Sequence, residues 1–166
     1  GLIDEYGVDA NKVTVIAPGV DVDLWAPPPN VTEDGRPVRI LFVGGDLSRK
    51  GGDLLLAAAE RLRGESDLPD FEVHLVTPAA VDPVPGVVVH PGLRANSAEL
   101  IEQYHRADIF CLPTWGDCLP MVLAEAGASG LPLVSTDVGA IAELVNDGTG
   151  RLIEPGDLEQ LVAALR

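Results

Sequence analysis

The 166-residue sequence contains few cysteines, few aromatic residues and few basic residues. Two cysteines are too few for a disulfide framework or for a four-ligand zinc site, and they favour a reducing, cytoplasmic setting. Lysine and arginine number 11 against 26 acidic residues, which gives a net charge of −15 at pH 7. This balance argues against nucleic acid as a partner, because a protein that binds a phosphate backbone needs a basic face.

Long apolar runs are also absent. The sequence has no stretch of the roughly 20 apolar residues that a membrane span needs, and no charged-then-apolar pattern typical of a signal peptide. Hydrophobic residues nevertheless make up 46% of the chain, which is enough for the packed core of one domain of ordinary size. A strongly acidic domain that binds an anionic ligand must do so with local features, such as a helix N-terminus, a glycine turn or a few placed cations.

Apolar runs alternate with segments of helical spacing along most of the chain. The patterns predict strands at 38–43, 71–76, 86–90, 107–112, 131–135 and 150–153, and helices at 53–63, 96–105, 120–129, 138–145 and 158–165. Asn96 and Glu99 have the spacing of a capping box, while Pro120 and Gly130 are typical of the start and the end of a helix.

Several of the expected strands are apolar throughout, which indicates burial on both faces. We therefore expect an α/β fold with a doubly wound, mainly parallel sheet, in which ligands bind where strands end and loops lead into helices. Residues 1–36 are expected to form a short strand and a proline-rich linker, and residues 37–166 the sheet domain. Both ends have the pattern of interrupted helices, so we expect the chain to be part of a longer protein.

A glycine-rich loop follows the first strand, with the sequence FVGGDLSRKGGD from 42 to 53. It combines glycines, the adjacent cations Arg49 and Lys50, and a helix start, which are the features that bind a diphosphate. A solvent-exposed surface turn is the alternative. The spacing fits neither a Walker loop nor a GxGxxG fingerprint.

Two carboxylates are separated by seven residues at the end of the fourth expected strand. Asp117 lies in the loop and Glu125 lies in the following helix among apolar neighbours. A buried carboxylate needs hydrogen-bond donors, and the hydroxyls of a sugar or a ribose would supply them. Alternatively, Glu125 lies on the solvent-exposed face of its helix.

The remaining candidate residues have simpler interpretations. A third turn, 135–143, could offer backbone N–H groups to a ligand, but an ordinary strand-to-helix turn explains it equally well. The three histidines lack metal-ligand spacing, and two of them, His74 and His90, fall in expected strands and are interpreted as structural. No metal site and no Ser-His-Asp or Cys-His arrangement is expected.

Together these segments resemble the C-terminal domain of glycosyltransferase family four, the group 1 glycosyltransferases of the GT-B fold. The resemblance covers nearly the whole chain. It rests on the segments 13–21, 42–51 and 131–135, and on the spacing from Asp117 to Glu125, which matches the family's E-x7-E motif. After residue 135 the family's closing pattern continues with Gly139, Asp147, Gly148, Gly150 and 155–157.

The resemblance implies a Rossmann-like domain that binds a nucleotide-sugar. Lys50 would bind the donor diphosphate together with Arg49, Gly44 and Gly45. Glu125 would bind the ribose hydroxyls, Asp117 would lie near the transferred sugar, and the backbone of Gly92, Leu93 and Arg94 would approach the base. No cofactor and no metal is expected, because cations and helix dipoles neutralise the diphosphate.

Two positions depart from the family pattern. The family usually has an arginine directly after the first glycine of the phosphate loop, where this chain has Gly45. The first position of the E-x7-E motif is Asp117, which is shorter by one methylene. Both departures favour an alternative in which the chain is a non-catalytic nucleotide-sugar-binding module.

The resemblance also implies a retaining enzyme whose acceptor binds on an N-terminal domain that precedes Gly1. That domain would be a partner of this one and would make any peripheral contact with a membrane. On its own, this chain is expected to bind a nucleotide without turnover. A nucleotide-sugar 2-epimerase of the same fold is a further alternative, but the order of Lys50, Asp117 and Glu125 favours the transferase.

Overall fold

The computed structural model describes residues 2–28 and 35–166. Within them, six strands form one sheet in which every neighbouring pair is parallel. The strand order is β3-β2-β1-β4-β5-β6, with bounds β1 (Val38–Val43), β2 (Phe71–Val76), β3 (Val87–His90), β4 (Ile109–Leu112), β5 (Leu133–Thr136) and β6 (Gly150–Ile153). The expected doubly wound α/β fold is confirmed, because all six expected strands are present.

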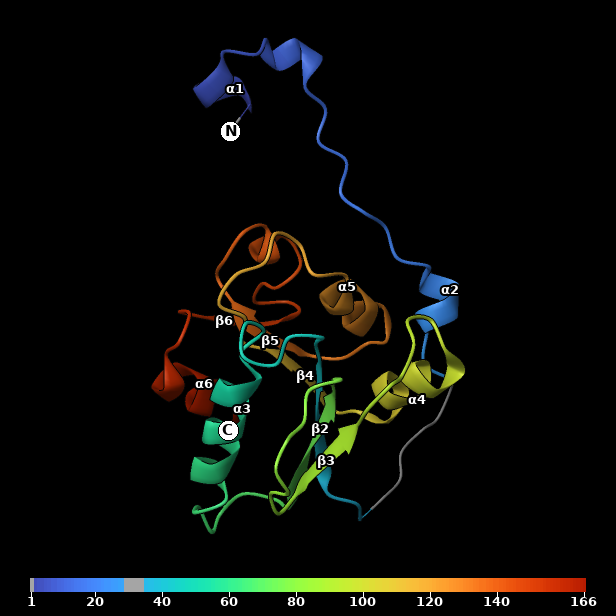
Figure 1. Cartoon of the computed structure of the whole chain (residues 1–166), viewed down its shortest axis with the longest axis vertical. Helices are drawn as coiled ribbons and strands as arrows, with labels where there is room; N and C mark the ends of the chain where they lie inside the picture. The colour runs from blue at the N-terminus through green and yellow to red at the C-terminus, as the bar shows by residue number, and fades with distance from the viewer. Residues whose placement is uncertain (1, 29–34) are drawn as a thin grey trace.

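Helices cover both faces of the sheet (Figure 1). On one side lie α3 (Gly52–Leu62) and α6 (Leu158–Leu165), which pack against each other, and on the other lie α4 (Ala98–Arg106) and α5 (Met121–Ala128). The central strands β1 and β4 contribute fully buried side chains, including Leu41, Phe42 and Phe110. Their burial on both faces explains the continuous apolar runs 40–43 in β1 and 109–112 in β4. None of the helices in the described ranges is both long and apolar enough to cross a bilayer.

The segment before the sheet differs from the expectation. We expected a short strand within residues 1–36, but the described part of this segment contains none and instead has α1 (Leu2–Tyr6), a 3-10 helix η1 (Ala10–Lys12) and α2 (Val22–Trp25). In Figure 1, α1 lies away from the sheet, whereas α2 lies beside α4 and α5. Trp25 anchors α2, because its ring is buried edge-to-face against Tyr104, 4.9 Å between centroids.

Two smaller differences concern how helices begin and how long they are. Asn96 does not cap α4, because its φ of 58° places it in the left-handed region; Ser97 is the N-cap and its Oγ accepts from the Leu100 N–H at 3.3 Å. The helix expected at 138–145 is reduced to a 3-10 turn, η2 (Ile141–Glu143). For the cap of α4, an N-cap residue needs an extended backbone so that its side chain can accept a hydrogen bond from an N–H in the first turn, and Ser97 meets this condition.

The strand order reverses between β1 and β4. The chain runs outward from β1 to β3 and then returns to place β4 on the other side of β1. At such a switch point the loops that follow the two central strands separate, and ligands bind in the crevice between them. Here these loops are 44–51 and 113–120, which contain the glycine-rich segment and Asp117.

Gly51 provides a test of how tightly these two loops pack. Its φ is +78°, and a Cβ there would overlap the carbonyl of Pro113 in the opposite loop. We expect Gly51→Ala to reduce the free energy of unfolding by roughly 2–4 kcal/mol, since a left-handed backbone and overpacking each cost about 1–3 kcal/mol. Urea unfolding would measure this loss.

Gly45→Ala is the matched control, because a Cβ at Gly45 would meet no atom within 4 Å. Equal stability of the two variants would contradict the close contact between Gly51 and Pro113.

Candidate functional site

An open cleft of about 330 Å³ lies at the carboxyl ends of the strands. Of the residues predicted for the site, five line this cleft: Gly44, Gly45, Lys50, Gly92 and Leu93. Met121 and Val122, in the first turn of α5, form part of the opposite wall. Arg49, Arg94, Asp117 and Glu125 are not among its lining residues.

The loop after β1 uses most of its own backbone donors. The N–H groups of residues 49–52 all donate within the loop, with Asp46 accepting from Arg49 through its side chain and from Lys50 through its carbonyl. Gly44 donates to the Val76 carbonyl at 3.0 Å. The N–H of Gly45 has no partner among the described residues, and this residue lines the cleft. Among the glycines of this loop, only Gly45 therefore offers the cleft a free N–H, beside Lys50, where the sequence suggested a series of free amides.

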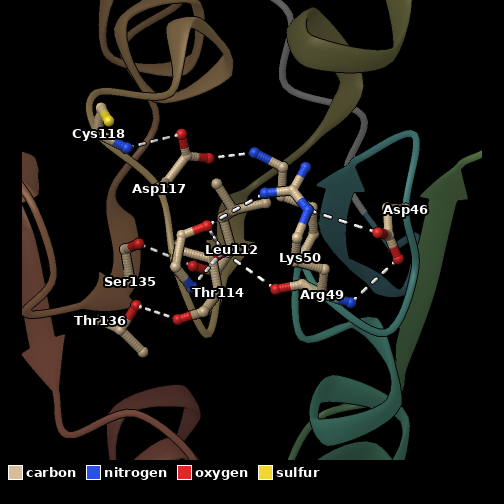
Figure 2. A network of polar contacts seen from close by, with 10 residues as sticks. Asp46, Arg49, Lys50, Leu112, Thr114, Asp117, Cys118, Ser135 and Thr136 are labelled. Carbon is tan, nitrogen blue, oxygen red and sulfur yellow. Dashed lines mark hydrogen bonds and ion pairs between the residues drawn. The ribbon is translucent and has the colours of Figure 1, made fainter.

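Lys50 and Asp117 form an ion pair across the switch point (Figure 2). The Nζ of Lys50 contacts Oδ2 of Asp117, and both side chains are about five-sixths buried, at 15% and 16% exposure. The second oxygen, Oδ1, accepts from the Cys118 N–H at 3.0 Å. The shorter side chain at position 117 thus still reaches the cationic loop.

Arg49 is directed away from the cleft. Its Nε lies 3.4 Å from the carboxylate of Asp46, and its guanidinium donates to the Gly116 carbonyl at 3.1 Å (Figure 2). Half of the Arg49 side chain is exposed. Of the two adjacent cations, only Lys50 lines the cleft.

The loop after β4 is braced by the neighbouring strand β5. Thr136 Oγ1 donates to the Thr114 carbonyl at 2.6 Å, and Ser135 Oγ donates to the Leu112 carbonyl at 2.7 Å (Figure 2). The N–H of Ala140 donates to the Cys118 carbonyl at 2.7 Å. In the third candidate turn, 135–143, the N–H of Ala140 therefore supports the Asp117 loop and is not available to a ligand.

Glu125 is half-buried on α5, one helical turn after Met121. The hydroxyl of Tyr104, itself fully buried on α4, donates to Oε2 of Glu125 at 2.8 Å. Burial raises the pKa of Glu125, and the hydrogen bond from Tyr104 partly opposes this rise. Glu125 is therefore not a freely solvated helix residue, and its Oε1 has no partner within the part of the chain that the structure describes.

Sequence reasoning missed two side chains at this site. His90 was interpreted as structural but lines the cleft, and Tyr104 was not singled out although it contacts Glu125. The available signal for His90 was that a polar residue ends an otherwise apolar strand, β3, at the edge where ligands bind. No cluster of three or more potential metal-ligating side chains occurs in the described residues.

Comparison with known proteins relates the chain to one family. Residues 37–166 match the family model described as glycosyl transferases group 1. Among similar curated proteins are a D-inositol 3-phosphate glycosyltransferase of Geodermatophilus obscurus, 33% identical over 99% of this chain and 42% of its own length, and an MMP alpha-(1->4)-mannosyltransferase of Mycolicibacterium hassiacum, 31% identical over 99% and 41%. This chain thus spans less than half of these relatives.

Solved structures agree on the fold. A glycosyltransferase from Rickettsia africae superposes with a TM-score of 0.81 at 21% identity, covering 99% of this chain and 48% of the other. The Anabaena protein HepE, crystallised with UDP-glucose, superposes with a TM-score of 0.74 at 19% identity over 95% and 48%. The Rossmann-like sheet is thus the architecture of one half of a GT-B protein.

The raised pKa of Glu125 predicts how its charge affects stability. A carboxyl whose pKa is higher in the folded chain binds more protons when folded. Its favourable contribution is therefore present below its ordinary pKa of 4.5 and is lost as the pH rises through the folded value. We expect Glu125→Gln to be more stable than the parent at pH 7, and this advantage to shrink toward pH 4.

Urea unfolding at both pH values would measure the effect. Glu60→Gln, on the exposed side of α3, is the control and should show no such pH-dependent difference. A Glu125→Gln variant whose relative stability does not change between the two pH values would contradict the burial of this carboxylate.

Proposed function

We propose, from the premise that this chain belongs to the group 1 glycosyl transferases, that it is the donor-binding domain of a retaining glycosyltransferase. Such an enzyme breaks the bond between the anomeric carbon of a sugar and the terminal phosphate of a nucleotide diphosphate. A new bond to an acceptor oxygen forms on the same face of the sugar, and the nucleotide diphosphate leaves. The observation that supports this proposal best is a buried lysine beside a free glycine N–H in the switch-point cleft.

Lys50 is the proposed ligand of the donor diphosphate. A chain with a net charge of −15 repels anions in general, so a local cation is needed to hold one. Lys50 has two further N–H donors beyond the one that faces Asp117, since an ammonium group has three. These donors and the N–H of Gly45 would bind the phosphate oxygens, and Asp117 would keep Lys50 in place while lying near the hydroxyls of the transferred sugar.

Glu125 is the proposed ligand of the ribose. Tyr104 occupies Oε2 only, which leaves Oε1 to accept from the hydroxyls of a ribose. The carboxylate lies one turn along α5 from the cleft wall at Met121. The backbone of Gly92, Leu93 and Arg94 is proposed to border the base, and two of these residues line the cleft.

The rest of the reaction is proposed to require a second domain. This chain spans about 42% of the Geodermatophilus relative, so the acceptor and part of the catalytic groups would belong to the remainder of such a protein. We propose that this chain alone binds the nucleotide-sugar without transferring the sugar, without a metal ion and in the cytoplasm. Any contact with a membrane would be made by the other domain.

Gly45 favours a second candidate, a nucleotide-sugar-binding module without catalysis. The position that usually bears an arginine in the family has no side chain here, and Arg49 does not replace it because its guanidinium faces Asp46 and Gly116. Assaying sugar transfer by a protein that contains both domains separates the two candidates. Transfer supports the enzyme, whereas tight nucleotide binding without transfer supports the module.

Replacing Lys50 tests the phosphate role. Lys50→Ala should weaken the binding of a nucleotide diphosphate by about 1.5–3 kcal/mol, the usual value of a hydrogen bond to a charged group. Calorimetric titration with UDP, GDP and ADP would measure the loss, which should be absent for the nucleosides. Lys12→Ala, in the exposed η1, is the control for the change in net charge. Equal losses for nucleosides and diphosphates would mean that Lys50 only supports the fold.

Replacing Glu125 tests the ribose role. We expect Glu125→Ala to melt at or above the parental temperature, since a partly desolvated charge is removed and alanine favours helix. The same variant should bind the nucleotide more weakly, and Glu125→Gln should lose less than alanine does. Thermal melts and calorimetry on the same samples provide both readouts. Parental nucleotide affinity in a normally folded Glu125→Ala domain would refute the role.

A further inference from the structure

Three side chains form a continuous line of contacts that ends at the cleft. The carboxylate of Glu72 lies 3.1 Å from Nε2 of His74, and Nδ1 of His74 lies 3.0 Å from Nε2 of His90. The two imidazoles are stacked, with centroids 5.2 Å apart and planes at 20°. His74 is buried at 8% exposure, whereas His90, at the carboxyl end of β3, lines the cleft.

The strand register explains this alignment. His74 pairs with Val88, and side chains two residues apart share a face of the sheet, so His90 lies one step beyond His74 on the same face. Glu72 precedes His74 by two residues and lies on that face as well. The line therefore depends on the pairing of β2 with β3, and it does not rely on loop conformation.

With both imidazoles neutral, only one arrangement of protons satisfies this line of contacts. A carboxylate only accepts, so Nε2 of His74 must donate to Glu72, and the Nδ1 of a neutral His74 must then accept. His90 consequently donates from Nε2 to His74, and its own Nδ1 carries no proton. That Nδ1 has no partner among the described residues.

His90 is also held in the neutral form. Burial is the largest cause that lowers its pKa below the ordinary value of 6.5, and the nearby Arg39 lowers it further. At neutral pH the ring therefore has a single free hydrogen-bond acceptor, on a residue that lines the cleft. Phosphate oxygens are acceptors themselves, so this atom does not suit the diphosphate and instead suits a ligand group with an N–H.

We propose that His90 is a specificity-determining residue that accepts a hydrogen bond from an N–H of the donor's base, and that His74 and Glu72 are positioning residues that fix its tautomer. The inference rests on the proposed function, since it requires a nucleotide in this cleft. The spacing is suitable, because β3 is two strands from β1 and thus about 10 Å away, in the range that separates a nucleotide's base from its diphosphate. Lys50 follows β1 and takes the phosphate end.

Binding of nucleotide-sugars and of pyrophosphate distinguishes the base from the phosphate. His90→Phe should lower the affinity for the best ligand among UDP-glucose, GDP-mannose and ADP-glucose by about three- to tenfold, as expected for the loss of one neutral hydrogen bond. Affinity for inorganic pyrophosphate should stay unchanged. His90→Asn, whose amide oxygen still accepts, should retain part of the affinity. His105→Gln on α4, outside the residues that line the cleft, is the control for a histidine replacement.

A double-mutant cycle tests the tautomer. An amide at position 72 can donate to His74, which releases the constraint on His90, so Glu72→Gln should weaken nucleotide-sugar binding in the parent. It should have no further effect in the His90→Phe background, because Glu72 acts only through His90.

The possible failures are distinct. If the parent binds none of the nucleotide-sugars, the proposed function fails and this inference fails with it. If the parent binds and His90→Phe is unchanged, or loses pyrophosphate affinity equally, only the role of His90 is overturned. If Glu72→Gln has the same effect with and without His90, the positioning role is overturned.

Discussion

The ion pair between Lys50 and Asp117 is the interaction on which the cleft depends. It joins the loops that follow β1 and β4, the two strands between which the sheet order reverses. Both groups are largely removed from water, and a charge in that position is costly unless it has a partner. Backbone contacts reinforce the pair, since the Arg49 carbonyl accepts from the Trp115 N–H at 3.0 Å and from Thr114 Oγ1 at 3.2 Å. The two loops therefore form a single unit whose one buried cation is held in a fixed place.

A second set of contacts connects the linker to the far end of the cleft. Trp25 from α2 packs on Tyr104, Tyr104 stacks on Phe110 of β4 with centroids 5.6 Å apart, and its hydroxyl binds Glu125. Aromatic packing thus fixes the position of the hydroxyl group that orients the carboxylate. The described part of the segment before the sheet domain acts on the site from a distance, since residues 2–28 and 35–36 are not among those that line the cleft.

Periodicity predicted the sheet and the loops well, because an apolar run such as 40–42 reports burial directly. It could not predict contacts between distant residues: Lys50 and Asp117 are 67 positions apart, and Tyr104 and Glu125 are 21 apart. Sequence pairs residues only within one element, whereas these pairs arise when separate elements pack. The place of His90 at the cleft could not be predicted for the same reason, since its contact with His74 follows from the register of β2 and β3. The missed cap at Ser97 has a more local cause, because Asn96 takes a left-handed backbone and Ser97 an extended one.

Gly139 limits how the cleft can adapt to a ligand. Its φ is +59°, and a Cβ there would overlap the carbonyl oxygens of Asp117 and Cys118. The loop that holds Asp117 is thus in close contact with a backbone turn behind it and has no space to shift toward that turn. The other rim is more open, since a Cβ at Gly45 or at Gly92 would meet no atom within 4 Å.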